Sequence, residues 1–130
     1  MNIAQLTRAE EQIMKILWEV EPGTVQHILG KFDSPKPART TVSTILSILE
    51  NKGFVTHETQ GKTNSYTTLV KKEDYSKSQL SGILKNYFNN SFASMASFFA
   101  KENNLSIEEL DELLEETKLA LQKEKNNSHE

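Results

Sequence analysis

Apolar side chains recur every three or four residues in the first part of the chain, and this period predicts amphipathic helices. The first helix should begin at Thr7, because Thr7 and Glu10 have the spacing of a capping box, and Pro22 should end it. Thr24 precedes a short second helix, and a third should span roughly residues 38–52. The apolar faces of these helices predict a core that includes Ile13, Leu17, Val42, Ile45 and Leu49.

The stretch that follows the third helix predicts two strands. Residues 54–59 and 65–70 are rich in β-branched and aromatic side chains, and a polar segment with Gly61, residues 60–64, separates them. This pattern is typical of a β-hairpin. Three helices followed by a hairpin predict a mainly α fold, the winged helix-turn-helix, in which the hairpin is the wing.

A long apolar stripe begins at Tyr75 and continues through Phe99, until residues 102–104 interrupt it. Ser106 and Glu109 then repeat the capping-box spacing at the start of another amphipathic helix. One helix cannot bury so much apolar surface alone, so we expect it to pack against a second copy of the chain; the alternative is that it folds back on the N-terminal half. The expected dimer-interface residues are Leu80, Ile83, Leu84, Tyr87, Phe88, Phe92, Met95, Phe99, Leu110 and Leu114.

These patterns divide the chain into a winged-helix domain at residues 1–72, a helical dimerisation domain at 73–125 and a flexible polar tail at 126–130. The total of 130 residues, 36% of them hydrophobic, suits one or two small cores. The chain has no cysteine, which excludes disulfides and thiolate metal sites, and it has no apolar run of about 18 residues that could span a membrane. We therefore expect a cytoplasmic protein.

Catalytic motifs are missing from the sequence. His27, His57 and His129 lie in three separate segments, and no pair of histidines has the spacing of metal ligands. Six of the 18 carboxylates, between Glu108 and Glu116, crowd the start of the last helix, where they suit the helix dipole. We expect no enzyme activity, no cofactor and no metal.

Basic charge is concentrated around the third helix and the hairpin. Between Lys31 and Lys72, seven basic and three acidic residues give a net charge of +4, whereas the rest of the chain carries −7. Cations fix a protein on phosphates, and short polar side chains let a helix approach base edges in the major groove. Residues 1–72 are therefore predicted to bind DNA, and a dimer of them would match a palindrome. The alternative is a winged-helix module that binds only proteins.

Three segments carry a resemblance to a known family. Residues 6–18 (LTRAEEQIMKILW) resemble the first helix of the penicillinase and methicillin-resistance repressors, the BlaI/MecI type. Residues 39–53 (RTTVSTILSILENKG) are similar to their recognition helix, and Gly61-Lys62 with Tyr66 is similar to their wing. The resemblance covers roughly residues 4–72, and the C-terminal helices match only in pattern.

The resemblance implies a dimeric transcriptional repressor that binds a palindromic operator. By position, the residues implied to contact DNA are Arg39, Thr40, Thr41, Ser43 and Thr44 in the major groove, with Lys52 and Lys62 near phosphates. Two of the matched residues have a competing structural role, since Thr41 could cap the helix and Tyr66 could pack under the wing.

The family also implies a partner, a membrane sensor metallopeptidase that inactivates the repressor by cutting an Asn-Phe bond in the C-terminal helices. This chain has no Asn-Phe dipeptide, and Phe98-Phe99 lies at the corresponding place. Copper-responsive relatives use a C-terminal cysteine cluster, and no cysteine occurs here. Neither inducing mechanism therefore transfers to this chain unchanged; cleavage beside Phe99 with a different specificity is the alternative.

Overall fold

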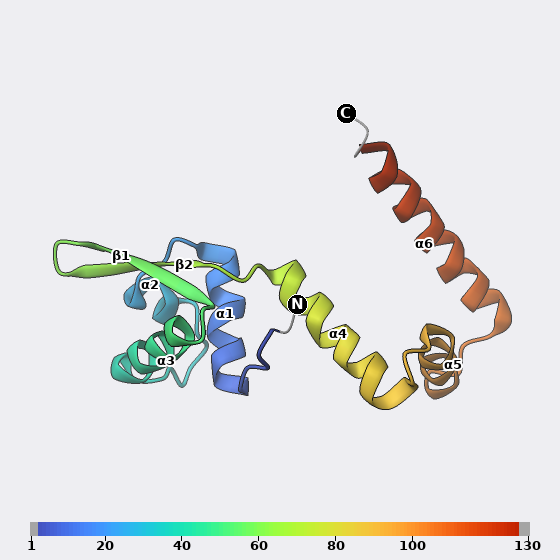
Figure 1. The fold of residues 1–130 in the computed structure, drawn as a ribbon, viewed down its shortest axis with the longest axis horizontal. Coiled ribbons are helices and arrows are strands. Elements are labelled where there is room, and N and C mark those ends of the chain that lie inside the picture. The colour runs from blue at the N-terminus through green and yellow to red at the C-terminus, as the bar shows by residue number, and fades with distance from the viewer. Residues whose placement is uncertain (1–2, 128–130) are drawn as a thin grey trace. The chain divides into compact units, whose positions relative to one another are not determined.

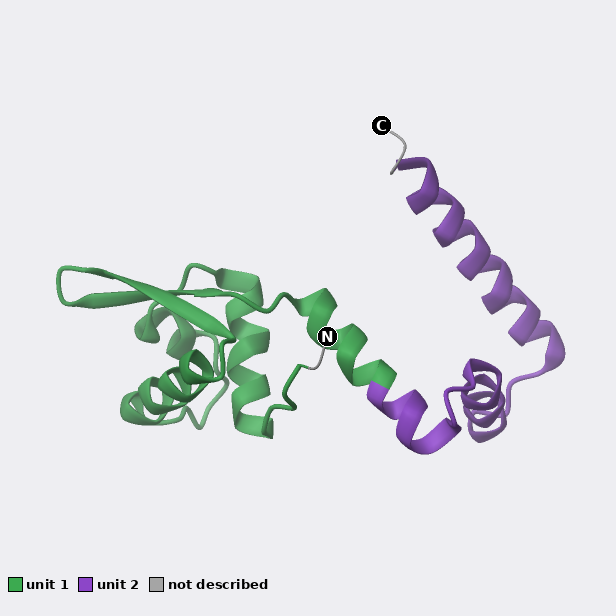
Figure 2. Cartoon of the chain, in the orientation of Figure 1, with its two compact units in different colours: residues 1–81 green, residues 82–130 purple. Residues whose placement is uncertain are grey.

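The computed structural model describes residues 3–127, and the chain divides into two compact units, residues 1–81 and 82–130 (Figure 2). The described elements, labelled in Figure 1, are α1 (Arg8–Val20), α2 (Val25–Gly30), α3 (Arg39–Asn51), β1 (Val55–Gln60), β2 (Thr63–Thr68), α4 (Lys72–Phe88), α5 (Phe92–Glu102) and α6 (Ile107–Asn127). Three helices, a hairpin and further helices confirm the predicted fold class.

The first helix starts where the sequence predicts. Thr7 Oγ1 accepts a hydrogen bond from the Glu10 amide at 3.2 Å, and the Thr7 amide donates to Glu10 Oε1 at 2.9 Å. This reciprocal pair is a capping box, which satisfies amides that the helix itself leaves unpaired. The helix ends before Pro22, as expected, because proline has no amide hydrogen to continue the ladder.

The core of the N-terminal unit lies where α1, α2 and α3 meet the hairpin. α3 contributes Val42, Leu46 and Leu49, all fully buried, whereas Ile45 is half-buried at the edge. The buried hydrophobic residues are Leu6, Ile13, Met14, Leu17, Ile28, Val42, Leu46, Leu49, Phe54, Val55, Tyr66 and Tyr75. The apolar faces predicted from the sequence therefore do face one another.

The hairpin is tighter than the sequence suggested. β1 and β2 pair antiparallel from Val55↔Thr68 to Gln60↔Thr63, so only Gly61 and Lys62 form the turn. Gly61 adopts φ +65°, a conformation that suits a residue without Cβ at the first position of a two-residue turn. The prediction of a turn over residues 60–64 is thus too long: most of that segment continues the ladder, because paired backbones tolerate exposed polar side chains.

Two features of the C-terminal half differ from the sequence analysis. Tyr75, predicted to start the apolar stripe, lies in the core of the first unit. The stripe is also not one helix, because Asn89 and Asn90 adopt φ values of 50° and 61° and separate α4 from α5. Asparagine is one of the few residues that tolerate this left-handed conformation, so a helix can end there without glycine.

The second unit buries little within one chain. No side chain of α5 or α6 is buried, and Phe92 is 64% exposed. Phe88 and Phe98 are in ring contact, with centroids 5.7 Å apart. The predicted tail begins inside α6, since Asn126 and Asn127 are helical, and its last three residues, 128–130 with His129, lie outside the described part.

Candidate nucleic-acid interface

The surface face of α3 carries the residues that the resemblance assigned to the major groove. Arg39, Thr40, Thr41 and Thr44 are exposed, and Ser43 is half-buried. Thr40 and Thr44 lie opposite the buried apolar face, because residues four apart share one side of a helix, whereas Arg39 is the first residue of the helix. The structure therefore brings these five side chains to one helix and to its first turns.

The N-terminus of α3 has no side-chain cap. Ala38 is the N-cap residue, and no side chain makes a capping hydrogen bond there. Thr41 therefore does not cap the helix, which was the structural alternative for this residue. The first amides of a helix point along its axis and carry partial positive charge. Thr41 is exposed and lies in the first turn of α3.

Two contacts orient the polar side chains of α3. Arg39 Nη1 donates to Gln26 Oε1 on α2 at 2.6 Å. Thr44 Oγ1 donates to the carbonyl oxygen of Thr40 at 2.9 Å, which occupies the hydroxyl hydrogen and leaves its oxygen free to accept. The sequence analysis missed Gln26, because a surface glutamine on a short helix has no distinguishing pattern.

The wing carries one exposed lysine at its tip, which projects beyond α2 and α3 (Figure 1). Lys62 occupies the second turn position and is exposed. Behind the tip, Thr59 Oγ1 donates to Asn64 Oδ1 across the strands at 2.8 Å. The turn therefore presents a cation on a paired β-ribbon, which extends by about 3.4 Å per residue from the base of the hairpin in the usual antiparallel geometry.

The base of the wing is attached to the helices. Tyr66 is buried and exchanges two backbone hydrogen bonds with Gly23, at 2.8 and 2.9 Å. Its ring contacts His57, whose Nδ1 lies 2.6 Å from Glu50 Oε1 at the end of α3. Tyr66 thus has the packing role that was one of its two alternatives, and through His57 and Glu50 it links the wing to the end of α3.

Lys52, expected near phosphates, makes an internal ion pair. Its Nζ lies 2.8 Å from Oε1 of the buried Glu10 on α1. Burial raises the pKa of Glu10, but the hydrogen bonds from Lys52 and Thr7 outweigh it and hold that pKa below its ordinary value. Contact of Lys52 with a phosphate would compete with this pair, so its DNA role stays a prediction.

A second carboxylate holds the end of the hairpin. Glu21 accepts hydrogen bonds from the amide and the hydroxyl of Thr68, each at 2.9 Å, and Lys71 Nζ lies 3.6 Å away. Burial raises the pKa of Glu21, and the two bonds from Thr68 with the charge of Lys71 lower it to below its ordinary value. The sequence analysis missed Glu21, which directly precedes the Pro22 that ends the first helix.

The residues expected at a dimer interface are gathered on α4, α5 and α6. Most are exposed in the single chain, among them Leu80, Ile83, Tyr87, Phe92, Phe99 and Leu114, and the other four, Leu84, Phe88, Met95 and Leu110, are half-buried. Large apolar side chains at such exposure are unusual for a surface that faces only water.

Comparison with known proteins then identifies the family. The family model described as "Penicillinase repressor" matches residues 6–118, which include both the winged helix and most of the C-terminal helices. The chain belongs to the penicillinase repressor family. The resemblance drawn from three short segments is thus confirmed, and it extends well past residue 72.

Curated members of the penicillinase repressor family match nearly their whole length. The penicillinase repressor of Bacillus licheniformis is 30% identical over 115 residues, which cover 86% of this chain and 88% of that protein. The methicillin resistance regulatory protein MecI of Staphylococcus aureus (strain N315) is 24% identical over 110 residues, covering 84% and 89%. MecI of Mammaliicoccus sciuri is 25% identical over 114 residues, with the same coverage of 84% and 89%.

Residues 3–127 lack two kinds of feature that would point to other functions. No helix in that range is both long and apolar enough to cross a lipid bilayer. Among the same residues, no group of three or more histidine or acidic side chains is arranged to hold a metal ion.

Proposed function

We propose that this member of the penicillinase repressor family is a transcriptional repressor that binds a palindromic DNA operator as a homodimer. The observation that carries the proposal is the division of α3 into two faces. Val42, Leu46 and Leu49 are fully buried, whereas Arg39, Thr40 and Thr44 face solvent without serving the core. A helix that packs on the core with its apolar face and exposes a polar face is the kind of helix that binds in a major groove.

Each polar residue of the interface has a role that its chemistry supports. Arg39 donates to base-edge acceptors, and guanine presents two of them in the major groove. Thr40, Thr41 and Ser43 reach phosphates or base edges through their hydroxyls. Thr44, whose hydroxyl hydrogen is already donated to the helix, offers its methyl group to a thymine methyl. Lys62 on the wing neutralises a phosphate, and Lys52 would do so only by leaving Glu10.

The homodimer rests on the apolar face of the C-terminal helices. Tyr87 and Ile107 are 77% and 76% exposed in the single chain, and neither α5 nor α6 buries a residue. A second copy supplies a matching surface by symmetry, because a two-fold interface uses the same patch twice. The same symmetry places two recognition helices on the two halves of a palindrome.

A selection experiment tests the proposed function and finds the operator at the same time. The full-length protein is used to select duplexes from a randomised DNA library, and the affinity for the recovered sequence is measured by fluorescence anisotropy at several salt concentrations. We expect a palindrome, with specific binding about 10³–10⁷ times tighter than binding to a scrambled duplex. The affinity should fall steeply with salt, because each neutralised phosphate releases a counterion.

The competing function, a winged-helix module that binds only proteins, makes the opposite prediction. It gives no enriched sequence and no salt-dependent binding to any duplex. The exposed cationic side chains and the exposed polar face of α3 favour DNA binding over binding to proteins alone. We also predict that a membrane metallopeptidase inactivates the repressor and that the repressor acts in the cytoplasm.

A further inference from the structure

Ile48 is an exposed apolar side chain on the polar side of α3. Among the described residues before α4, Ile48 and Leu69 are the large hydrophobic side chains that are exposed, at 39% and 57%. Ile48 lies four residues after Thr44, which lies four residues after Thr40, so these three side chains follow one side of the helix. Leu46, in contrast, is fully buried on the opposite side. The core therefore does not account for an isoleucine at position 48.

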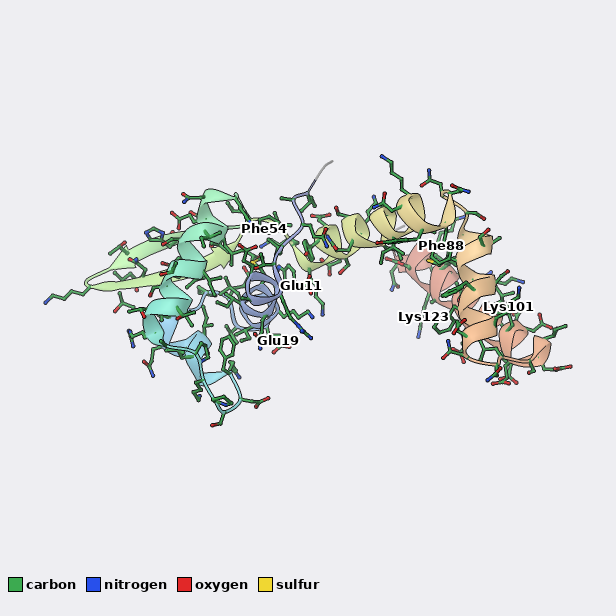
Figure 3. All side chains as sticks on the ribbon, turned by 90° about the horizontal axis from the view of Figure 1, so that it is seen from below. Glu11, Glu19, Phe54, Phe88, Lys101 and Lys123 are labelled. Atoms are coloured by element: carbon green, nitrogen blue, oxygen red, sulfur yellow. The ribbon has the colours of Figure 1, made fainter. Side chains whose placement is uncertain are left out.

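The C-terminal half of α3 is anchored, and this fixes the side of the helix that carries Ile48. Leu49 is fully buried, and the amide of Phe54, labelled in Figure 3, donates to its carbonyl oxygen at 2.9 Å. Glu50 Oε1 lies 2.6 Å from His57 Nδ1 on β1. The residues that follow Ile48 are thus held by the core and by the hairpin, so α3 cannot rotate to bury Ile48 without breaking these contacts.

The chemistry of an isoleucine limits what it can recognise on DNA. Its side chain has no hydrogen-bond donor or acceptor, so it distinguishes bases only by apolar contact. The apolar group that the major groove presents is the C5-methyl of thymine. The neighbouring exposed residues on this side of α3, Thr44, Ser47 and Asn51, are polar and uncharged, which suits base edges better than an apolar protein surface.

We propose that Ile48 is a specificity-determining residue that contacts a thymine methyl group in each half of the operator. This inference rests on the proposed function and adds a base preference at a residue to which the family resemblance assigns no role. The contact removes both the isoleucine side chain and the methyl group from water, which favours thymine over a base without that methyl. Thr44 has the same role in the proposed function, one helical turn earlier.

The experiment removes single methyl groups from the operator. The palindrome selected by the full-length protein is synthesised with each thymine in turn replaced, in both half-sites, by deoxyuridine, which lacks only the methyl. Wild-type protein should lose about fourfold in affinity per half-site at the thymine that Ile48 contacts, because burial of one such carbon group contributes about this factor. Ile48→Ala should bind the unmodified operator more weakly, and the same replacement should then have no further effect.

Three variants serve as matched controls. Leu69→Ala shortens the other exposed apolar side chain, which lies outside α3, and should keep the wild-type pattern. Ile48→Val keeps an apolar contact and should keep part of the sensitivity to the methyl group. Thr44→Ser removes a methyl group one turn earlier, so it should abolish the sensitivity at a different thymine, about one or two base pairs away for a helix that lies along the groove. Thermal unfolding of each variant checks that the winged helix is intact.

The outcomes are distinguishable. Loss of the sensitivity at one thymine in Ile48→Ala, but not in Leu69→Ala, supports the inference when thermal stability is unchanged. The same sensitivity at every thymine in Ile48→Ala and in wild type overturns it, and so does a selected palindrome in which no replacement weakens wild-type binding. If Ile48→Ala weakens binding to every duplex equally and unfolds at lower temperature, Ile48 serves the fold and the inference is wrong.

The failure of this inference differs from the failure of the proposed function. In each contrary outcome above, wild-type protein still binds its palindrome specifically, so the repressor proposal stands. If wild-type protein binds no duplex, the proposed function fails first and the inference fails with it.

Discussion

The two units of this protein use the same kind of sequence pattern with opposite results. In the N-terminal unit Met14 and Leu46 are completely buried, whereas in the C-terminal unit Leu114 is 48% exposed although it also lies in an amphipathic helix. Helical period predicts which residues share a face, but it does not say whether the same chain covers that face. In the first unit three helices and a hairpin enclose one centre; in the second, a single chain leaves the apolar faces uncovered.

The comparison teaches where stability and recognition reside. The first unit has its core, its capping box and its ion pairs within residues 3–81, so its fold needs no partner. The second unit buries no side chain of α5 or α6, and in the proposed function a second copy covers its apolar surface. We therefore expect mutations in the first unit to change monomer stability or DNA contacts, and mutations in the second to change assembly.

Removal of residues 82–130 should have the largest effect. The cut follows Ser81, because a cut at the sequence-based boundary of 72 would remove Tyr75 from the core. The shortened protein should remain folded and monomeric and bind single half-sites normally. Its affinity for the palindrome should fall by about 10²–10⁴-fold through lost avidity. Sedimentation velocity measures the oligomeric state, and fluorescence anisotropy measures the affinity for DNA. A full-length protein that is monomeric at micromolar concentration contradicts the expectation.

Leu46→Ala and Leu114→Ala compare the two units with the same substitution. Leu46→Ala should lower the free energy of unfolding by about 2–5 kcal/mol, because it opens a cavity in a closed core. Leu114→Ala should leave the unfolding of the N-terminal unit unchanged and weaken the dimer. Urea unfolding at two protein concentrations separates them, since only the effect of Leu114→Ala should depend on concentration. Equal, concentration-independent losses would mean that one chain buries both leucines.

Glu10→Gln tests the buried ion pair and its pH dependence. At pH 7 the loss of the charged bond to Lys52 should cost about 1.5–3 kcal/mol. The pKa of Glu10 is lowered in the fold from its ordinary value of 4.5, so its stabilisation is complete above pH 4.5 and is lost as the pH falls through the folded pKa. Thermal unfolding from pH 7 to 3 should therefore show a smaller acid loss in Glu10→Gln than in wild type. Glu19→Gln, which is exposed on the same helix, is the control and should match wild type.

Arg39→Ala tests whether the first unit reads DNA through α3. The side chain is exposed and donates a hydrogen bond to Gln26, which is itself exposed, so stability should be unchanged. Specific affinity should fall by about 1–3 kcal/mol, the usual worth of one good base contact. Arg8→Ala removes the same group from the exposed start of α1 and should have no such effect. A domain that melts in Arg39→Ala would contradict the assignment of the helix faces.

Lys62→Ala should have the smallest effect and the most characteristic one. A wing lysine on a phosphate contributes equally to all sequences, so the slope of log affinity against log salt should become shallower by about one. Specific and scrambled duplexes should weaken alike. Lys77→Ala removes the same charge from exposed α4 and should leave the slope as it is. A loss confined to one operator variant would instead indicate base recognition by the wing.

The local parts of this structure were predictable from the sequence. The capping box of Thr7 and Glu10 and the strand-turn-strand pattern around Gly61 use neighbours only a few residues apart. The same holds for the face of α3 that carries Thr40 and Thr44, because helical period alone assigns it. These features predicted the fold class and provided the candidate DNA contacts, whereas the match to the family model identified the family.

Only the tertiary structure decided which distant residues meet. Glu10 pairs with Lys52 across 42 positions, Glu21 holds Thr68 across 47, and Tyr75 reaches Glu11 across 64. The sequence near Tyr75 does not distinguish it from the apolar stripe that follows. Helical period indicates on which face of a helix a residue lies, but it does not indicate which residues it contacts. Hydrogen bonds and ring contacts act over a few ångströms, so they form only after the fold has brought their residues together. The sequence thus determined the elements and their faces, and packing determined which side chains hold those elements in position.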